Sequence, residues 1–170
     1  MPKTRSQERS GPSPKLTDPY LVKKIPEPNI CPGCGLVYYK KRWRKDEELK
    51  NTFTGPVYNQ KCPACRKIED HYPMGIVTIS GNFWPTVKDQ IINLIHHQEE
   101  KENFTNPLAR IMSLTYRKDV LVVETTTENL AIMIGKALNR AYKGDLKISI
   151  SDNKIARVNW ERTVDLSKIK

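Results

Sequence analysis

The sequence lacks any hydrophobic run long enough to cross a membrane. No stretch of its 170 residues approaches the roughly 20 consecutive apolar residues that a transmembrane helix needs. Its first residues are polar and charged, whereas a signal peptide begins with a short basic region and an apolar core. We therefore expect a cytoplasmic protein in a reducing compartment, with no membrane partner.

Recognisable catalytic motifs are also absent. The chain has no glycine-rich phosphate loop and no order of Ser, His and Asp, or of Cys and His, that indicates a nucleophile with its base. Its three histidines, His71, His96 and His97, are most simply surface residues, the last two placed to interact with a helix dipole. We predict that the protein is not an enzyme and takes no small-molecule substrate. A metal-dependent enzyme is the alternative, which a second bound metal ion would favour.

Acidic residues are too few to balance the basic ones. There are 19 Asp and Glu against 29 Lys and Arg, which gives a formal net charge of +10. An excess of this size predicts a polyanionic partner, nucleic acid before an anionic membrane surface. A basic protein without such a partner is the alternative interpretation. The length allows one ordinary domain and a small module held together by a metal ion.

Cysteine is scarce, and its four positions form a pattern. Cys31 and Cys34 make one C-x-x-C pair, and Cys62 and Cys65 make a second pair after 27 intervening residues. Two such pairs supply the four sulfur ligands of a structural Zn²⁺ site. Two disulfides are the first alternative, which the absence of a secretory signal disfavours. A redox pair is the second, but it usually opens a helix, and residues 35–39 after Cys34 have a strand pattern.

We predict that residues 29–72 form a zinc ribbon with strands at 36–39 and 54–59. Between the strands lies a basic run with one tryptophan, which suits phosphate contacts and base stacking. The alternative is a solvated loop whose tryptophan packs on the small core of the ribbon. Two more cations follow the second cysteine pair. The predicted RNA contacts of the ribbon are Lys40, Lys41, Arg42, Trp43, Arg44, Lys45, Arg66 and Lys67.

The two ends of the chain are low in apolar residues. Residues 1–28 are rich in Pro, Ser, Lys and Arg, and we predict a flexible basic arm that either orders on RNA or remains solvated. Residues 20–22 and 25–26 are its apolar positions and are expected to dock on the ribbon. We predict a frayed tail at residues 163–170.

Residues 73–162 predict one α+β domain. Strands are expected at 75–80, 111–116, 120–124, 146–150 and 155–160, with helices from 84–85 to 102 and at 128–142. Thr125 and Glu128 have capping-box spacing, and Gly144 follows the second helix as a C-terminal cap. This order predicts a ferredoxin-like βαββαβ sandwich, an antiparallel sheet with two helices on one face, extended by a C-terminal strand. Further RNA contacts are predicted at Arg117, Lys118, Lys136, Arg140 and Lys143.

Three sequence features together resemble a known family. They are the C-P-G-C-G and C-P-A-C pairs, residues 72–77 (YPMGIV) and residues 124–127 (ETTT), followed by matching segments at 130–135, 142–146 and 156–158. Over residues 17–162 the chain resembles the N-terminal half of the large-ribosomal-subunit nuclear export adaptor family, and more closely its short prokaryotic relatives. The full family has more than one zinc site and further β domains, which this sequence does not show, so an export function is not expected. The resemblance implies contact with the ribosome or with structured RNA through the zinc module and the α/β surface.

These observations lead to one hypothesis and one alternative from a different class. The hypothesis is a non-enzymatic, zinc-stabilised RNA-binding protein that docks on ribosomal RNA, on the large subunit, during assembly or in a dormant, non-translating state. Ribosomal proteins would be additional partners. The alternative is a protein–protein adaptor that uses the sheet as its platform, with zinc purely structural.

Overall fold

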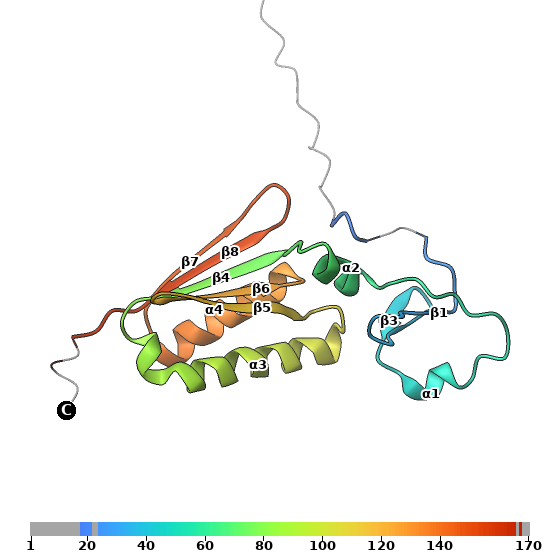
Figure 1. Cartoon of the computed structure of the whole chain (residues 1–170), viewed down its shortest axis with the longest axis horizontal. Coiled ribbons are helices and arrows are strands. Elements are labelled where there is room, and N and C mark those ends of the chain that lie inside the picture. Colours follow the sequence, from blue (N-terminus) through green and yellow to red (C-terminus); the bar gives the residue numbers. More distant parts are fainter. Residues whose placement is uncertain (1–17, 22–23, 166, 168–170) are drawn as a thin grey trace, which may run out of the picture.

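The computed structural model describes residues 18–21, 24–165 and 167, and it consists of a small module beside a larger domain (Figure 1). We call residues 29–72 the cysteine module and residues 73–162 the α/β domain. Among the described residues, no helix combines the length and the apolar character needed to cross a membrane. The mixed α+β class predicted from the sequence is confirmed.

The cysteine module contains a small antiparallel sheet and two short helices. Its elements are β1 (Asn29–Ile30), β2 (Val37–Tyr39), β3 (Arg42–Arg44), α1 (Glu47–Lys50) and α2 (Pro63–Glu69), with the sheet in the order β1-β2-β3. The strand predicted at 36–39 is confirmed as β2. The strand predicted at 54–59 is wrong, because only Tyr58 forms a bridge there, with Asn29. Gly55 and Pro56 explain the difference, since glycine weakens a strand and proline cannot donate to a ladder.

The basic run at residues 40–45 takes the place of that strand. Lys40 and Lys41 form the turn between β2 and β3, and Tyr39 lies opposite Arg42 in register. The run is therefore a β-hairpin, not the solvated loop of the alternative interpretation. Pairing with β2 satisfies the backbone of β3, so its charged side chains do not prevent a strand.

The described residues before β1 are attached to the cysteine module. Asp18 forms an ion pair with Lys67, and the Tyr20 ring lies 5.3 Å from the Tyr72 ring. The carboxylate of Glu27 accepts two backbone hydrogen bonds from the β2–β3 turn. These residues of the predicted arm thus contact the module, and Tyr20 docks on it as expected. Residues 1–17 of that arm, together with Val22 and Lys23, lie outside the described part of the chain.

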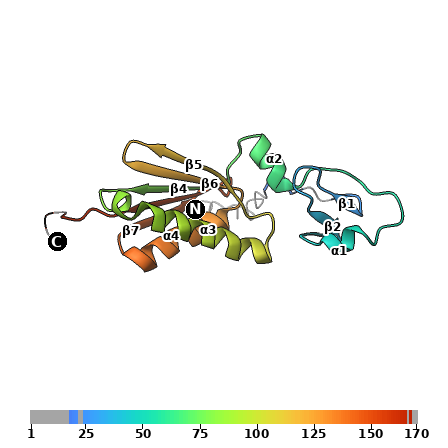
Figure 2. The same cartoon turned by 60° about the horizontal axis from the view of Figure 1, so that its bottom comes forward.

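The α/β domain is a five-stranded sheet with two helices on one face (Figures 1 and 2). The helices are α3 (Lys88–Thr105), which follows a 3₁₀ turn η1 (Trp84–Val87), and α4 (Glu128–Tyr142). The strands, in spatial order, are β5 (Ile111–Arg117), β6 (Val120–Thr125), β4 (Gly75–Ser80), β8 (Ala156–Glu161) and β7 (Asp145–Ile150).

The predicted element order and the helices on one face are confirmed, but the expected wholly antiparallel sheet is wrong. A ferredoxin-like sheet would place β7 beside β4 in antiparallel pairing. Instead β8 lies between β4 and β7 and runs parallel to β4. The burial of the two strands explains this choice. Ala156, Val158 and Trp160 of β8 are fully buried, whereas Ile148 and Ile150 of β7 remain exposed, so the strand with the buried face takes the inner position.

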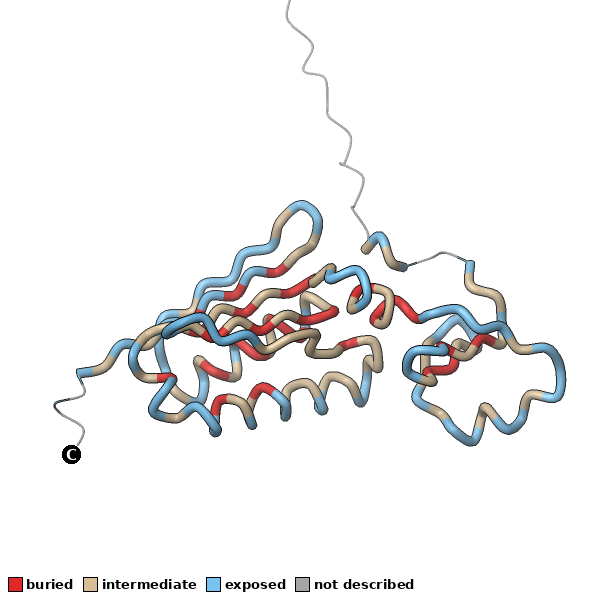
Figure 3. Tube along the Cα trace, in the orientation of Figure 1, coloured by how far each residue is buried: buried red, intermediate tan, exposed pale blue. Residues whose placement is uncertain are grey.

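The main core lies between the sheet and the helices, where Figure 3 shows the buried segments facing one another. Leu130, Ile134 and Leu138 recur every four residues along α4, so they share one face. Gly135 lets this face approach β8 closely, because a Cβ atom there would lie 2.3 Å from Val158 Cγ1. Close contact between α4 and β8 therefore depends on a residue without a side chain.

The cap of α4 differs from the prediction by two residues. Thr127, not Thr125, is the N-cap, and its hydroxyl accepts a hydrogen bond from the Leu130 N–H. Thr125 belongs to β6 and is buried, where its hydroxyl donates to the Thr127 carbonyl at 2.8 Å. At the other end the cap is Lys143, with φ of 57°, one residue before the predicted Gly144.

Candidate metal centre and basic hairpin

The four cysteines predicted as metal ligands converge at one point. Their Sγ atoms all lie within 4.8 Å of one another, and the Cys34 and Cys62 sulfurs are 3.6 Å apart. Sulfur ligands arranged tetrahedrally at about 2.3 Å from one Zn²⁺ ion would be about 3.8 Å apart. A disulfide would require about 2.05 Å. The four sulfurs can therefore hold a metal ion, and all four cysteines are free of disulfides.

A tight turn after β1 presents the first cysteine pair. The Gly35 N–H donates to the Cys31 carbonyl at 2.8 Å, and the Cys31 N–H donates to the Leu36 carbonyl at 2.8 Å. Gly35 has a φ of 76°, in the region that favours glycine. A side chain at Gly33 would place its Cβ atom 2.9 Å from Cys65 Sγ. Both glycines are thus needed for the two pairs to come together.

The second cysteine pair lies at the start of α2. The sequence suggested two equivalent turns, but only the first pair lies in a turn of that kind. Cys62 is the N-cap, and Pro63 occupies the first turn, where its missing N–H costs nothing. Cys62 Sγ accepts from the Cys65 N–H at 3.4 Å, and Cys31 Sγ accepts from the Cys62 N–H at 3.2 Å. Hydrogen bonds of this kind favour the thiolate form, which is the form that binds metal.

Arg110, from the α/β domain, contacts the sulfur cluster. Its Nη2 donates to Cys34 Sγ at 3.0 Å, and its Nη1 donates to Cys65 Sγ at 3.6 Å. Its Nε donates to the Pro107 carbonyl at 3.3 Å, which holds the guanidinium in place. Four thiolates around a divalent cation carry a net charge of −2, so a guanidinium here is favourable. Arg110 therefore links the metal centre to the α/β domain.

The thiols do not ionise equally. Burial disfavours the thiolate of Cys34, but hydrogen bonds from Arg110 and the Leu36 backbone outweigh burial and lower the pKa of Cys34 to about 7. Burial is the main cause that raises the pKa of Cys62 and of Cys65, and neighbouring sulfur charges add to it. A bound cation supplies the positive charge that such buried thiolates need. With four protein ligands the site has no open position, which indicates a structural metal.

We expect Arg110→Ala to weaken Zn²⁺ binding by about 10- to 100-fold, the usual cost of removing a group that hydrogen-bonds metal ligands. The measurement is competition for Zn²⁺ with a chromophoric chelator. Arg117→Ala is the matched control, because it removes the same side chain from the other end of β5. Equal Zn²⁺ affinity for Arg110→Ala and the wild type would show that Arg110 does not support the site.

The residues predicted to contact RNA are spread over both parts of the chain, and Lys136, Arg140 and Lys143 are exposed on α4 or at its C-terminal end. Lys40, Lys41, Arg42 and Lys45 are exposed on or next to the β2–β3 hairpin, whereas Trp43, Arg44 and Arg66 are half-buried. Arg117 and Lys118 are exposed at the β5–β6 turn. That turn lies at the end of the domain away from the cysteine module (Figure 1), about 20 Å along β5 from Arg110. One compact patch cannot include both turns.

The prediction for Lys67 is wrong. This side chain is buried, with the residue only 3% exposed. Its ammonium pairs with the Asp18 carboxylate and donates to the Thr126 carbonyl at 3.0 Å. Lys67 therefore joins three segments of the chain, and it is not available to a phosphate. The charge pattern could not reveal this, because its partners lie 49 and 59 residues away in sequence.

Trp43 packs on the small core of the cysteine module, as the alternative interpretation of the sequence predicted. One part of its side chain packs against the buried cluster of Cys31, Leu36, Cys62 and Ala64. Its ring also lies 5.2 Å from the Tyr38 ring. The remaining surface faces a hollow toward the end of α3. Packing thus fixes the orientation of Trp43, and part of its surface stays accessible.

The turn of the basic hairpin is strained. Lys40 and Lys41 have φ angles of 50° and 60°, a left-handed conformation that costs a residue with a side chain roughly 1–2 kcal/mol. Asn-Gly is the usual sequence for such a two-residue turn. The Glu27 carboxylate accepts from the Lys40 N–H at 2.7 Å and the Lys41 N–H at 3.0 Å, and thereby holds the turn. These two hydrogen bonds offset part of the conformational cost of the turn, which Lys118 at the β5–β6 turn, with a φ of 52°, also pays.

The histidines do not join the cysteine cluster. Among the described residues, the four cysteines are the only group of three or more possible ligands placed to share one ion. His71 is exposed, and His96 Nδ1 lies 3.5 Å from the Glu99 carboxylate. His96 and His97 lie in the middle of α3, because the helix extends to Thr105, past the predicted end at residue 102.

Sequence reasoning missed two residues of this region, Arg110 and Phe104. Nothing in the local sequence indicates that Arg110 faces the cysteines, because the contact joins residues 76 positions apart. Phe104 did carry a signal. It follows the polar run at residues 98–103 and is out of phase with buried Ile91 and Ile95 of the same helix. An aromatic residue in that position is expected on the surface, and Phe104 is 92% exposed.

Comparison with known proteins gives no match for this chain among family models, curated proteins or solved structures.

Proposed function

We propose that this protein is a non-enzymatic RNA-binding protein, stabilised by Zn²⁺, that docks on the ribosome in the cytoplasm. The observation that carries the proposal is the β2–β3 hairpin, where exposed cations extend from a turn whose backbone is held by Glu27. We further propose the large subunit as the docking site, during assembly or in a dormant, non-translating state. The ribosomal destination rests on the resemblance of the sequence to the export adaptor family.

Zn²⁺ is the metal that best suits the site. Zinc accepts four thiolates in a tetrahedron, and closed four-cysteine sites of this kind have a structural role. The buried cluster of the module contains only Cys31, Leu36, Cys62 and Ala64, with Trp43, Cys65 and Leu108 packed against it. These few apolar groups cannot offset the conformational entropy lost when more than 40 residues become ordered. Metal binding is therefore needed to keep the module, and with it the hairpin, folded.

RNA is the partner that best suits the hairpin. The net charge of +10 favours a polyanion, and Lys40, Lys41, Arg42 and Lys45 are exposed within six consecutive residues. Lysine and arginine side chains neutralise phosphates and release counterions, which supplies affinity with little dependence on sequence. The hairpin is therefore suited to grip a phosphate backbone and to position the protein on a folded RNA.

The double substitution Lys40→Asn with Lys41→Gly tests the proposal without damaging the fold. Asn-Gly is the preferred sequence for this turn, so the variant should be at least as stable as the wild type. Loss of two phosphate contacts should reduce the slope of log affinity against log salt by about 1.4–1.8. It should also weaken binding to large-subunit RNA at low salt. Fluorescence anisotropy over a salt series measures both effects, and co-sedimentation with ribosomes measures docking.

Lys118→Gly is the matched control. Lys118 is also an exposed lysine with a positive φ, 52°, in a hairpin turn, but at the far end of the sheet. We expect RNA binding by this variant to equal that of the wild type. If the Asn-Gly variant keeps the affinity and the salt slope of the wild type, the β2–β3 hairpin is not the RNA contact. If the wild-type protein does not bind RNA at low salt, the proposed RNA-binding function is wrong.

A further inference from the structure

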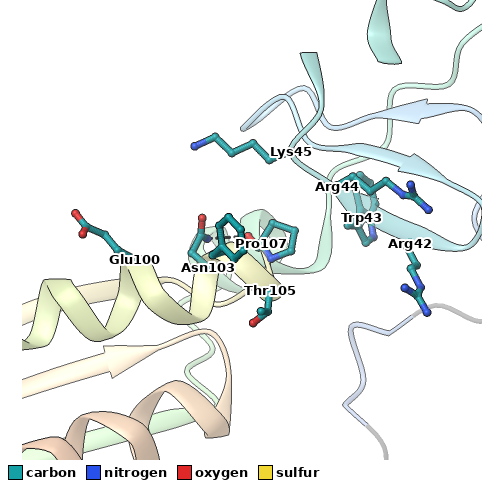
Figure 4. A pocket seen from close by; sticks show the side chains of 9 residues that line it. Arg42, Trp43, Arg44, Lys45, Glu100, Asn103, Thr105 and Pro107 are labelled. Carbon is teal, nitrogen blue, oxygen red and sulfur yellow. Dashed lines mark hydrogen bonds between the residues drawn. The ribbon is translucent and has the colours of Figure 1, made fainter. Parts of the chain in front are cut away.

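A groove separates the cysteine module from the end of α3. One hollow of about 670 Å³ is lined by β3 on one side and by the last turn of α3 on the other (Figure 4). A second hollow of about 440 Å³ shares Arg42, Trp43, Thr105 and Pro107 with the first, so the two form one continuous groove. The aromatic and cationic residues along it are Tyr38, Lys41, Arg42, Trp43, Arg44, Lys45 and Phe104.

Phe104 is the most exposed large apolar residue of the groove. The residue is 92% exposed, although a phenylalanine side chain is among those that gain most from burial. It lies in the last turn of α3, one residue before the helix ends at Thr105. A phenyl ring presented in this way beside cations has the chemistry of a stacking platform for a nucleobase.

The two walls of the groove differ in charge. Arg42, Arg44 and Lys45 line the wall formed by the hairpin strand, and Figure 4 shows them apart from the side chains of α3. The opposite wall has Glu100, and its helix has no basic residue in the last turn. Phosphates are therefore favoured along the hairpin wall and disfavoured near the helix. A strand lying in the groove would direct its bases toward α3, where Phe104 lies.

Contacts on both sides hold the groove in shape. Leu108, just after α3, packs against the buried cluster of the cysteine module. The Asn103 side-chain amide donates to the carbonyls of Pro107 at 3.2 Å and Ala109 at 3.1 Å, which orders the turn between the helix and β5. Arg110 then joins that turn to Cys34 and Cys65. These contacts thus fix both walls, and little ordering is needed when a ligand binds.

We infer that this groove binds a single-stranded RNA segment, with its phosphates on the hairpin wall and one unstacked base on Phe104. The inference rests on the proposed function, because it names the form of RNA that the hairpin meets. Duplex RNA does not fit this chemistry, since its bases are paired and stacked on one another. It would contact the cations of the hairpin alone.

The test compares Phe104→Ala, Phe104→Trp and the wild type for binding to a fluorescent 12-nucleotide oligouridine and to a blunt RNA duplex of the same length. We expect Phe104→Ala to weaken single-strand binding by about tenfold, as for the loss of one stacked base, and to leave duplex binding unchanged. Phe104→Trp should restore single-strand binding. Because Phe104 is exposed, its removal leaves the fold intact, which thermal melting checks. Ile150→Ala, an exposed apolar truncation on β7, is the control and should bind like the wild type.

The outcomes separate this inference from the proposed function. Duplex and single-strand binding that are both unaffected by Phe104→Ala would overturn the groove and leave RNA binding through the hairpin in place. Wild-type protein that binds neither RNA would remove both. A third outcome is an oligoglutamate of the same charge that binds more tightly than oligouridine and whose binding is lost in Phe104→Ala. That result would assign the groove to an acidic peptide and overturn the inference as well.

Discussion

Removal of the metal ion is expected to unfold the cysteine module while the α/β domain stays folded. Metal binding to a four-cysteine site is worth roughly 10–16 kcal/mol near neutral pH, more than the net stability of most domains. The module has only four buried residues in its hydrophobic cluster, and two of these are the ligands Cys31 and Cys62. By contrast, the domain has 15 buried residues in its own cluster. Loss of the ion therefore removes most of what holds one part and little of what holds the other.

Backbone amide NMR spectra before and after a strong chelator measure this effect. Signals from β1–β3 and α2 should move to the chemical shifts of an unfolded chain, and signals from β4, β6, β8 and α4 should keep their chemical shifts. Addition of excess Zn²⁺ should restore the first set. The Cys62→Ser variant should give the collapsed spectrum without a chelator, because it lacks one ligand. A module whose signals keep their positions after complete loss of bound metal would show that the sulfurs are not what folds it.

Asp18→Ala is expected to cost about 3 kcal/mol in the free energy of unfolding. The substitution leaves the Lys67 ammonium buried without its carboxylate, and breaking a buried ion pair from one side costs roughly 3–5 kcal/mol. The lower end applies here, because the Thr126 carbonyl still accepts from Lys67 and the Asp18 side chain is 15% exposed. Urea unfolding of the metal-loaded protein gives the difference. Asp70→Ala is a suitable control, since this carboxylate is exposed and, within the described part of the chain, accepts a hydrogen bond only from the Tyr20 hydroxyl.

The double variant Asp18→Ala with Lys67→Met decides whether the unpaired charge is the cause. Methionine fills a volume similar to lysine without a charge, so the double variant should recover much of the stability lost in Asp18→Ala. A double variant as unstable as the single one would assign the loss to packing around Asp18. An Asp18→Ala protein as stable as the wild type would show that water reaches Lys67 and solvates it.

Much of the fold follows from local sequence patterns. Alternation of apolar residues at 75–80 and 120–124 predicted β4 and β6 closely, and four-residue spacing predicted α4 to its last residue. These patterns reflect the geometry of one strand or one helix, so they can be recognised before any partner is known. The β2–β3 hairpin was missed because its turn residues, Lys40 and Lys41, are not those that favour a two-residue turn.

The sequence by itself determined the group of four cysteines that could hold a metal ion, because coordination needs particular side chains at particular spacings and all four cysteines meet that demand. It also determined the positive charge that favours a polyanionic partner. Only the tertiary structure decided that β8 lies beside β4, that Lys67 is buried and that Arg110 reaches the sulfurs. Each of these depends on which distant segment competes best for a buried position, and chain spacing does not encode that outcome. The groove at Phe104 has the same origin, since its two walls come from segments about 60 residues apart that the packing of Leu108 on the cysteine module brings together.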